Sequence, residues 1–446
     1  MSVRRQRRFL CRIAALCASC TFLNGYIIGL IGMALPAATH SLSLSAVWAG
    51  AIGSAALCGI LIGSPVAGWA CERFGRRPVL ITQLVVFVAA SLAQLAVTGP
   101  TLLLALRLLL GIAMGSDYVV SSLLFAEFAP PRHRGRFLTG FQLSWYIGFL
   151  TACVIGAITL GTEGPWRTVL ASSALPAVII SILSIGVPES PRWLAAQGRT
   201  GQARTIAQRY IPDADEISSI APIEQSQSQY RELFSSRYRT RTAFICLFWL
   251  CNVLPYYAMA TYTPTLLNAF HIADGLAAAL ASNAAAVAGA LVCVLVVERQ
   301  GRRGTLLCSF WGAAAALLLV ATWPTAPATV IIASFLTFSF FNAGGGSLVG
   351  PYPSEVLPTS IRATGIGLAS AISRIGAIIG TFLLPIALNA FGAAPVLLTG
   401  TLVLAVGACA THRWAPETSG QRLPEHHTAP GRTPANSPTP GSPHPG

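Results

Sequence analysis

Three charged residues lie inside apolar stretches that are long enough to cross a membrane: Arg107, Asp117 and Arg374. On insertion scales each costs about 2.5–3.5 kcal/mol at the bilayer centre, so each needs a partner or a function. A carboxyl group removed from water favours its neutral form, so we predict that Asp117 carries a proton. A guanidinium at this depth is a ligand for carboxylates and phosphates, so we predict that Arg374 binds an anionic substrate. We predict that Arg107 modulates Asp117. The alternative for these charges is a buried salt bridge without a role in transport.

A charged motif occurs twice in the chain. Residues 72–78 read Glu-Arg-Phe-Gly-Arg-Arg-Pro, and residues 298–304 read Glu-Arg-Gln-Gly-Arg-Arg-Gly. A glutamate and then an arginine follow each copy at a similar distance: Glu127 and Arg134 after the first, Glu355 and Arg362 after the second. Many secondary transporters are built from two repeated halves with the substrate site between them. The repeat therefore favours a transporter.

The residue types of this motif predict a charge cluster at a helix end. Glycine permits the tight turn that such a short connection needs, and an acidic side chain beside several arginines can form ion pairs there. The predicted members are Glu72, Arg73, Gly75, Arg76 and Arg77 in the first copy, and Glu298, Arg302 and Arg303 in the second.

The composition is that of a membrane protein. Hydrophobic residues make up 54% of the chain and charged residues only 10%, with a mean hydropathy of +0.63. A soluble protein of this size needs more surface charge. The net charge of +14 does not indicate nucleic-acid binding, because the basic residues are confined mainly to short connections between apolar runs.

Counting about 20 apolar residues per crossing gives twelve predicted spans, six on each side of a longer polar stretch. They cover residues 12–36, 47–71, 78–98, 101–124, 137–160, 166–187, 241–268, 275–297, 304–323, 327–350, 362–388 and 391–412. Arginines are concentrated in every second connection. The excess of basic residues in cytoplasmic loops therefore predicts that both termini are cytoplasmic.

Four regions follow from this pattern. We predict a six-helix bundle over 1–187, a cytoplasmic linker with short amphipathic helices over 188–240, a second bundle over 241–413 and a disordered cytoplasmic tail over 414–446. The arginine-rich N-terminus resembles a secretory signal, but its apolar run is too long, so we interpret it as the flank of the first span. The eleven cysteines lie in or beside apolar spans, and we expect no metal and no cofactor.

Four motifs occur together: Gly68-x-x-x-Glu72-Arg73-x-Gly75-Arg76-Arg77, Arg107-x-x-x-Gly111-x-x-x-Gly115 with Glu127 and Arg134-Gly135, Pro188-Glu189-Ser190-Pro191-Arg192-Trp193-Leu194, and Pro416-Glu417-Thr418. Over roughly residues 10–420 the chain therefore resembles the major facilitator superfamily, in its sugar-porter-like and metabolite:proton symporter branches. The resemblance implies an all-α fold of two six-helix bundles that works by alternating access. It also implies that the charge clusters latch helices in the outward-facing state and release them in the inward-facing state. A static helix-end salt bridge is the alternative.

The same resemblance supplies candidates for substrate binding. Residues on helices that line the family's central cavity are Tyr26, Gln142, Asn252, Tyr256 and Tyr257. However, Gly350 replaces the tryptophan that stacks on the sugar ring in sugar porters, and Ile27 stands where many proton-coupled porters carry aspartate. These departures disfavour a hexose substrate.

We therefore predict a membrane transporter, functional as a monomer, that takes up a small organic metabolite with protons. A carboxylate or a similar anion is the favoured substrate, bound by Arg374, with Asp117 as the proton carrier. A sugar transporter, an efflux pump of the same fold, an uncoupled carrier and a non-transporting sensor remain alternatives. An enzyme is disfavoured, because no nucleophile–base pair or metal constellation is present.

Overall fold

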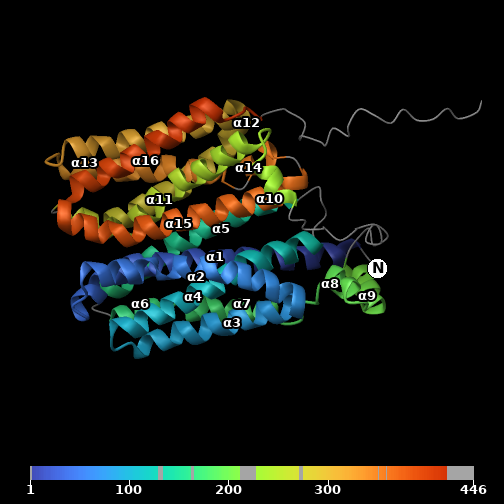
Figure 1. Ribbon diagram of the computed structural model, residues 1–446. Helices are drawn as coiled ribbons and strands as arrows, with labels where there is room; N and C mark the ends of the chain where they lie inside the picture. The colour runs from blue at the N-terminus through green and yellow to red at the C-terminus, as the bar shows by residue number, and fades with distance from the viewer. Residues whose placement is uncertain are drawn as a thin grey trace, which may run out of the picture.

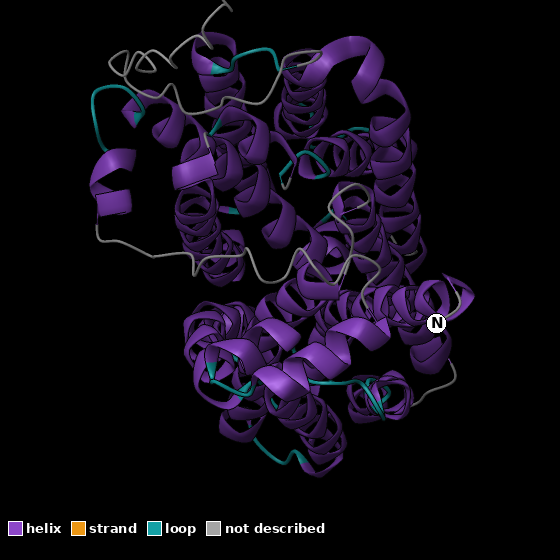
Figure 2. Ribbon diagram, turned by 90° about the vertical axis from the view of Figure 1, so that its right-hand side faces the viewer, coloured by secondary structure: helices purple, strands orange, loops and turns teal. Residues whose placement is uncertain are grey.

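The computed structural model describes residues 3–128, 134–161, 165–210, 228–270, 275–349, 351–357 and 359–418. This part of the chain is helical and contains no strand (Figure 2). Twelve segments within it are long and apolar enough to cross a membrane. The predicted fold of twelve membrane helices is confirmed.

The helices form two groups that lie side by side, with the N-terminal group below the C-terminal one in Figure 1. The first group consists of α1 (Val3–Ser41), α2 (Ala46–Phe74), α3 (Arg76–Ala93) with η1 (Gln94–Ala96), α4 (Pro100–Phe128), α5 (Arg134–Gly161), α6 (Trp166–Ala171) and α7 (Ala174–Ser184). The second consists of α11 (Arg239–Ala269), α12 (Gly275–Thr322), α13 (Ala328–Gly346), α14 (Pro351–Val356), α15 (Thr359–Phe391) and α16 (Ala393–Trp414). Three short helices lie between them in the sequence: α8 (Pro191–Ala196), α9 (Thr200–Tyr210) and α10 (Ser228–Leu233).

The predicted spans agree closely with the structure, but the end of the first was wrong and two others contain or adjoin an interruption. The first helix does not end at Pro36 but continues to Ser41, since helices in a bilayer tolerate proline when the freed backbone groups find other partners. The sixth span is interrupted at Ser172 and Ser173, which separate α6 from α7. The eighth and ninth predicted spans are confirmed as Ala277–Val297 and Arg302–Thr322, which both lie within α12 and are separated by a non-helical turn at Gly301.

Apolar side chains on the outside of the molecule indicate that its surface faces lipid. Leu175 and Ile185 are each 69% exposed, and Leu295 is 74% exposed. So much exposed apolar surface is unfavourable in water and is expected against lipid. The exposed surface is therefore apolar as well, and the interior is held together by close packing between helices.

Small residues set the position of α4 against α2. A Cβ added at Gly59 or Gly63 of α2 would meet the backbone of α4, and one added at Gly111 or Gly115 of α4 would meet the backbone of α2. The glycines of the Arg107-x-x-x-Gly111-x-x-x-Gly115 motif therefore allow the two helices to touch. This close contact fixes the depth at which the charged residues of α4 lie.

The two groups of helices meet at the end of the molecule that the arginine pattern assigns to the outside. The Tyr262 hydroxyl of α11 donates to the Ala49 carbonyl of α2 at 2.9 Å. Gly50 lies against the backbone of Phe382, and a Cβ at Gly32 would lie 3.0 Å from the Thr261 carbonyl oxygen. These contacts between α1 or α2 and α11 or α15 close the predicted outer end.

Candidate functional site

Asp117 lies inside the N-terminal group of helices, in a pocket made of hydrogen-bond donors. Its side chain is 1% exposed. The amide of Asn24 on α1 donates to Oδ2 at 2.7 Å, and the amide of Gln83 on α3 donates to Oδ1 at 2.9 Å. The Ser121 hydroxyl, one turn along α4, donates to the same Oδ1 at 2.7 Å. Sequence reasoning missed these three partners, which come from three helices.

This pocket can accommodate both protonation states of Asp117. Three donors satisfy the charged carboxylate without any cation. The carbonyl oxygens of Asn24 and Gln83 are buried and have no partner among the described residues. Because a half-turn of an amide exchanges its nitrogen and oxygen, either side chain can present an acceptor to a protonated Asp117. Such a pocket is suited to a carboxyl group that gains and loses a proton.

Arg374 of α15 reaches across the space between the two groups of helices. Its Nη1 donates to the Tyr257 hydroxyl of α11 at 3.0 Å. The guanidinium carbon lies 5.2 Å from the ring centroid of Tyr118 on α4 and 5.8 Å from that of Tyr257. Both rings are within the range of cation–π attraction. The arginine is therefore held by two phenol rings, one from each group.

Tyr118 connects the two charged sites. It follows Asp117 in the sequence, so a single helix, α4, presents the carboxyl group to the N-terminal interior and the phenol ring to Arg374. The predicted proton carrier Asp117 and a ring that contacts the predicted anion-binding residue Arg374 thus occupy neighbouring positions of α4. A shift of α4 that accompanies protonation would act directly on the Arg374 contact.

Four aromatic rings, those of Trp145, Tyr146, Tyr256 and Tyr257, form a cluster at the junction of α5 and α11. Trp145 lies 5.3 Å from Tyr146, 6.0 Å from Tyr256 and 6.0 Å from Tyr257, measured between ring centroids. The indole N–H of Trp145 and the hydroxyl of Tyr256 are buried and have no partner among the described residues. Rings with unused polar atoms suit a planar ligand that carries hydrogen-bonding groups.

A small cavity adjoins this aromatic cluster within the C-terminal group. Tyr256 of α11, Ser282 and Asn283 of α12, and Phe338 of α13 contribute to its wall. The free volume is about 10 Å³, which is room for one water molecule. The hydroxyls of Tyr256 and Ser282 lack described partners, so a water there would satisfy them. The larger hollow, beside Phe270 and Phe391, lies at the other end of α11 and α15.

Three predicted substrate ligands, Asn252, Tyr26 and Gln142, either bond to other residues of the protein or lie on its exposed surface. The Asn252 amide donates to the Asn342 carbonyl at 3.2 Å, and the Asn342 amide donates back to the Asn252 carbonyl at 3.3 Å. The Tyr26 hydroxyl is paired with the Ser172 hydroxyl at 2.8 Å. Gln142 is exposed, one turn of α5 from Tyr146. Asn252 and Tyr26 therefore join helices in this conformation.

Arg107 does not contact Asp117. The side chain is 1% exposed, and its Nη1 donates to the Ile27 carbonyl of α1 at 3.0 Å. The two residues are ten positions apart on α4, which is about 15 Å along the helix axis. The predicted direct influence of Arg107 on Asp117 is therefore not supported by a contact, because helical rise separates the two groups.

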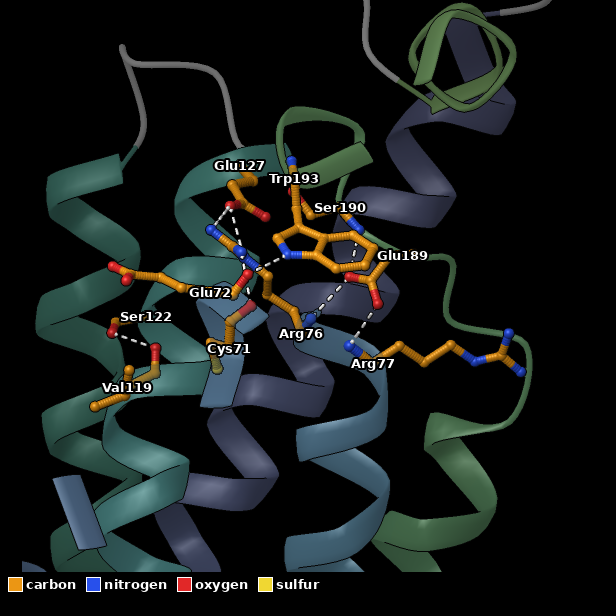
Figure 3. A network of polar contacts seen from close by, with 10 residues as sticks. All are labelled: Cys71, Glu72, Arg76, Arg77, Val119, Ser122, Glu127, Glu189, Ser190 and Trp193. Atoms are coloured by element: carbon orange, nitrogen blue, oxygen red, sulfur yellow. Dashed lines mark hydrogen bonds and ion pairs between the residues drawn. The ribbon is translucent and has the colours of Figure 1, made fainter. Parts of the chain in front are cut away.

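At the end of the N-terminal group that the arginine pattern assigns to the cytoplasm, Arg76 pairs with Glu127 rather than with Glu72 (Figure 3). Nε and Nη2 of Arg76 both lie 3.1 Å from Glu127 Oε1. Glu127 lies just beyond the apolar span of α4, and burial raises its pKa while Arg76 opposes that shift. The prediction of ion pairs around Glu72 was wrong for the described residues. Glu72 is exposed there, and its backbone carbonyl accepts from the indole of Trp193 at 2.8 Å.

Glu189 caps the start of α3 (Figure 3). Its Oε1 accepts from the backbone N–H of Arg76 at 2.8 Å, and its Oε2 accepts from that of Arg77 at 3.1 Å. The first N–H groups of a helix have no intrahelical acceptor, and a carboxylate there is doubly favourable. Glu189 was part of a recognised motif, but its role as a cap was missed. Arg73, which was also predicted to join the charge cluster, has its guanidinium over the Trp69 ring, 5.5 Å from the ring centroid.

The second copy of the motif repeats this arrangement in the C-terminal group. Arg302 pairs with Glu355, with Nε 3.1 Å from Oε2 and Nη2 3.2 Å from Oε1. Glu417 accepts from the backbone N–H groups of Arg302 and Arg303 at 2.9 and 3.2 Å. The Arg76–Glu127 and Arg302–Glu355 pairs each join helices of one group, which favours a static role for these two pairs. The side chains of Arg134, Glu298 and Arg362 lie outside the described part of the structure.

We expect Gly75→Ala to destabilise the protein. Gly75 has φ 98°, and an added Cβ would collide with the Glu189 carboxylate that caps α3. A non-glycine residue in such backbone conformations costs about 1–3 kcal/mol. Thermal unfolding in detergent measures the loss. Gly68→Ala on α2 is the control, because a Cβ there meets nothing within 4 Å. Equal unfolding temperatures for both variants would contradict the capping role.

Comparison with known proteins places these features in context. Residues 11–429 match the family model described as "Sugar (and other) transporter". The inner membrane metabolite transport protein YgcS of Escherichia coli is 39% identical over 93% of each chain. The niacin transporter NiaP of Acinetobacter baylyi is 29% identical, covering 89% of this chain and 91% of the relative. The E. coli xylose transporter XylE, in a partially occluded inward-open conformation, superposes with a TM-score of 0.78 at 20% identity, covering 93% of this chain and all of the other.

Proposed function

We propose that this chain, which belongs to the sugar (and other) transporter family, is a proton-coupled carrier that takes up a small organic anion by alternating access. Membership of the family makes it a multi-pass membrane transporter of small metabolites and not an enzyme. The coupling ion, the anion and the direction are parts of the proposal. We place it in the cytoplasmic membrane with both termini inside.

The surroundings of Arg374 carry the proposal of an anionic substrate. Among the described residues its partners are the phenol rings of Tyr118 and Tyr257, and no carboxylate pairs with it. A half-buried guanidinium without an acidic partner attracts a carboxylate, which it can bind through two parallel hydrogen bonds. The substrate would thus supply the missing negative charge at the boundary between the two groups of helices.

Asp117 supports the proposal of proton coupling. Its pocket holds donors for the charged form and potential acceptors for the neutral form. Tyr118, the next residue, contacts Arg374. A carrier that moves an anion together with a proton needs the two sites to influence each other, and one shared helix provides the shortest connection.

The aromatic cluster narrows the choice of substrate to test first. Trp145, Tyr146, Tyr256 and Tyr257 place ring faces and unused polar atoms next to Arg374. A planar ring with a carboxylate would meet both features. The similarity to a niacin transporter agrees with this choice, and nicotinate is therefore the first compound. A sugar substrate is the second candidate, because the family model and the superposed xylose transporter favour it.

Liposomes that hold a pH-sensitive dye provide the test. Purified protein is reconstituted, and nicotinate, aliphatic monocarboxylates, phosphate, xylose and glucose are added outside in turn while the internal pH is recorded. We expect internal acidification with a carboxylate and none with protein-free liposomes. Acidification with the sugars alone would overturn the anion proposal. Radiolabelled uptake without any pH change would overturn proton coupling and leave an uncoupled carrier.

A further inference from the structure

Arg107 is a buried cation whose hydrogen-bonding capacity is largely unused. Its side chain is 1% exposed, and the single described bond runs from Nη1 to the Ile27 carbonyl. The Nε and Nη2 atoms are buried and have no partner among the described residues. Buried polar groups in folded proteins are almost always paired, so each exception calls for an explanation.

No acidic residue of the described chain neutralises this charge. Asp117 is about 15 Å away along α4 and is engaged by Asn24, Gln83 and Ser121. The contact on α1 comes from the backbone of an isoleucine. Arginine does not lose its proton in proteins, so neutralisation by deprotonation is not available. Water could occupy the free donors but would leave the charge unbalanced in an apolar environment.

We propose that Arg107 holds a small monovalent anion, a chloride ion or a carboxylate, at the contact between α1 and α4. The anion would accept from Nε and Nη2 and replace the missing acidic side chain. This site is distinct from that of Arg374, because Arg374 contacts α4 at Tyr118, which is about 16 Å from Arg107 along the helix axis. The carrier therefore has two cationic sites, one in each half.

The depth of Arg107 indicates how the anion enters. The residue is seven positions from Pro100, the first residue of α4, which is about 10 Å from the predicted outer end. That end is closed by the contacts of Gly32 with Thr261 and of Ala49 with Tyr262. The anion would thus be enclosed in this conformation and exchange with the outside when these contacts open. The inference does not depend on the identity of the transported substrate.

Thermal unfolding of the purified protein tests this site without a transport assay. The measurement uses the Arg374→Gln variant, in which the other cationic site is removed. Sodium chloride or sodium formate replaces sodium sulfate at constant ionic strength, because sulfate is larger and divalent. We expect a saturable rise in unfolding temperature with chloride, formate or both, since a ligand bound to the folded state stabilises it. The two salts distinguish an inorganic ion from a carboxylate.

The double variant Arg374→Gln, Arg107→Gln is the matched comparison and should lose this rise. Arg107→Lys in the same background keeps the charge and should retain a weaker, still saturable rise. An unchanged rise in the double variant would overturn the proposal, as would the absence of any anion dependence in Arg374→Gln. Neither outcome bears on proton-coupled uptake, which the liposome assay measures in the unmodified protein.

Discussion

Asp117→Asn should abolish proton-coupled accumulation of the substrate and preserve exchange of labelled for unlabelled substrate. Asparagine has nearly the same shape, and its carbonyl oxygen can still accept from Ser121 and Gln83, which now donate to Oδ1. The variant cannot bind or release a proton, so a pH gradient can no longer drive uptake. Reconstituted protein is assayed for gradient-driven uptake, with exchange at equal pH on both sides measured in parallel.

A suitable control lies five residues further along the same helix. Ser122 is exposed, and its hydroxyl bonds to the backbone carbonyls of Tyr118 and Val119. Ser122→Ala should leave both gradient-driven uptake and exchange near those of the unmodified protein. Gradient-driven uptake that persists in Asp117→Asn would show that another group carries the proton. Loss of exchange as well as uptake would point to a purely structural role of the Asp117 pocket.

Arg374→Gln should raise the substrate concentration for half-maximal exchange by about 30-fold or more. Removing one partner of a buried charge pair costs about 2–5 kcal/mol, and each 1.4 kcal/mol is a factor of about ten. Arg374→Lys keeps the charge but loses the planar fork, so it should recover only part of the affinity. The concentration dependence of exchange in liposomes measures both variants.

Tyr257→Phe is the matched comparison for Arg374. It removes only the hydroxyl that accepts from Nη1 at 3.0 Å and keeps the ring beneath the guanidinium. A single hydrogen bond contributes about 0.5–1.5 kcal/mol, so we expect at most a tenfold loss of affinity. If Arg374→Gln has no larger effect than Tyr257→Phe, Arg374 does not hold a charged group of the substrate.

The sequence predicted features that depend on local composition. Length and apolarity indicate twelve spans, and the repeated Gly-Arg-Arg motif indicates two halves. The rarity of charge within apolar runs singled out Asp117 and Arg374. Such inferences need no knowledge of which helices are neighbours.

What the sequence did not predict depends on helix neighbours. Asn24 and Gln83 contact Asp117 from helices far away in the chain. In the first motif, Arg76 pairs with Glu127, which is distant in the sequence, and not with the nearby Glu72. The reason is that Glu127 is buried beside Arg76, whereas Glu72 faces solvent. Candidate ligands inferred from resemblance were least secure. The side chains of Asn252 and Asn342 each donate to the other's backbone carbonyl, and the Tyr26 hydroxyl is hydrogen-bonded to that of Ser172.

The carboxylate caps at Glu189 and Glu417 have a practical consequence for shortening or tagging the protein. Glu417 accepts hydrogen bonds from two backbone N–H groups at the start of the part of α12 that follows the turn at Gly301. The neighbouring Thr418 donates to Glu355, and the Pro416 carbonyl accepts from Tyr352. A C-terminal truncation or a fluorescent fusion placed after Thr418 keeps these bonds. A deletion that starts before Pro416 removes Glu417, which is the only residue described in the C-terminal half that caps a helix as Glu189 does. The backbone N–H groups of Arg302 and Arg303 then lose their acceptor.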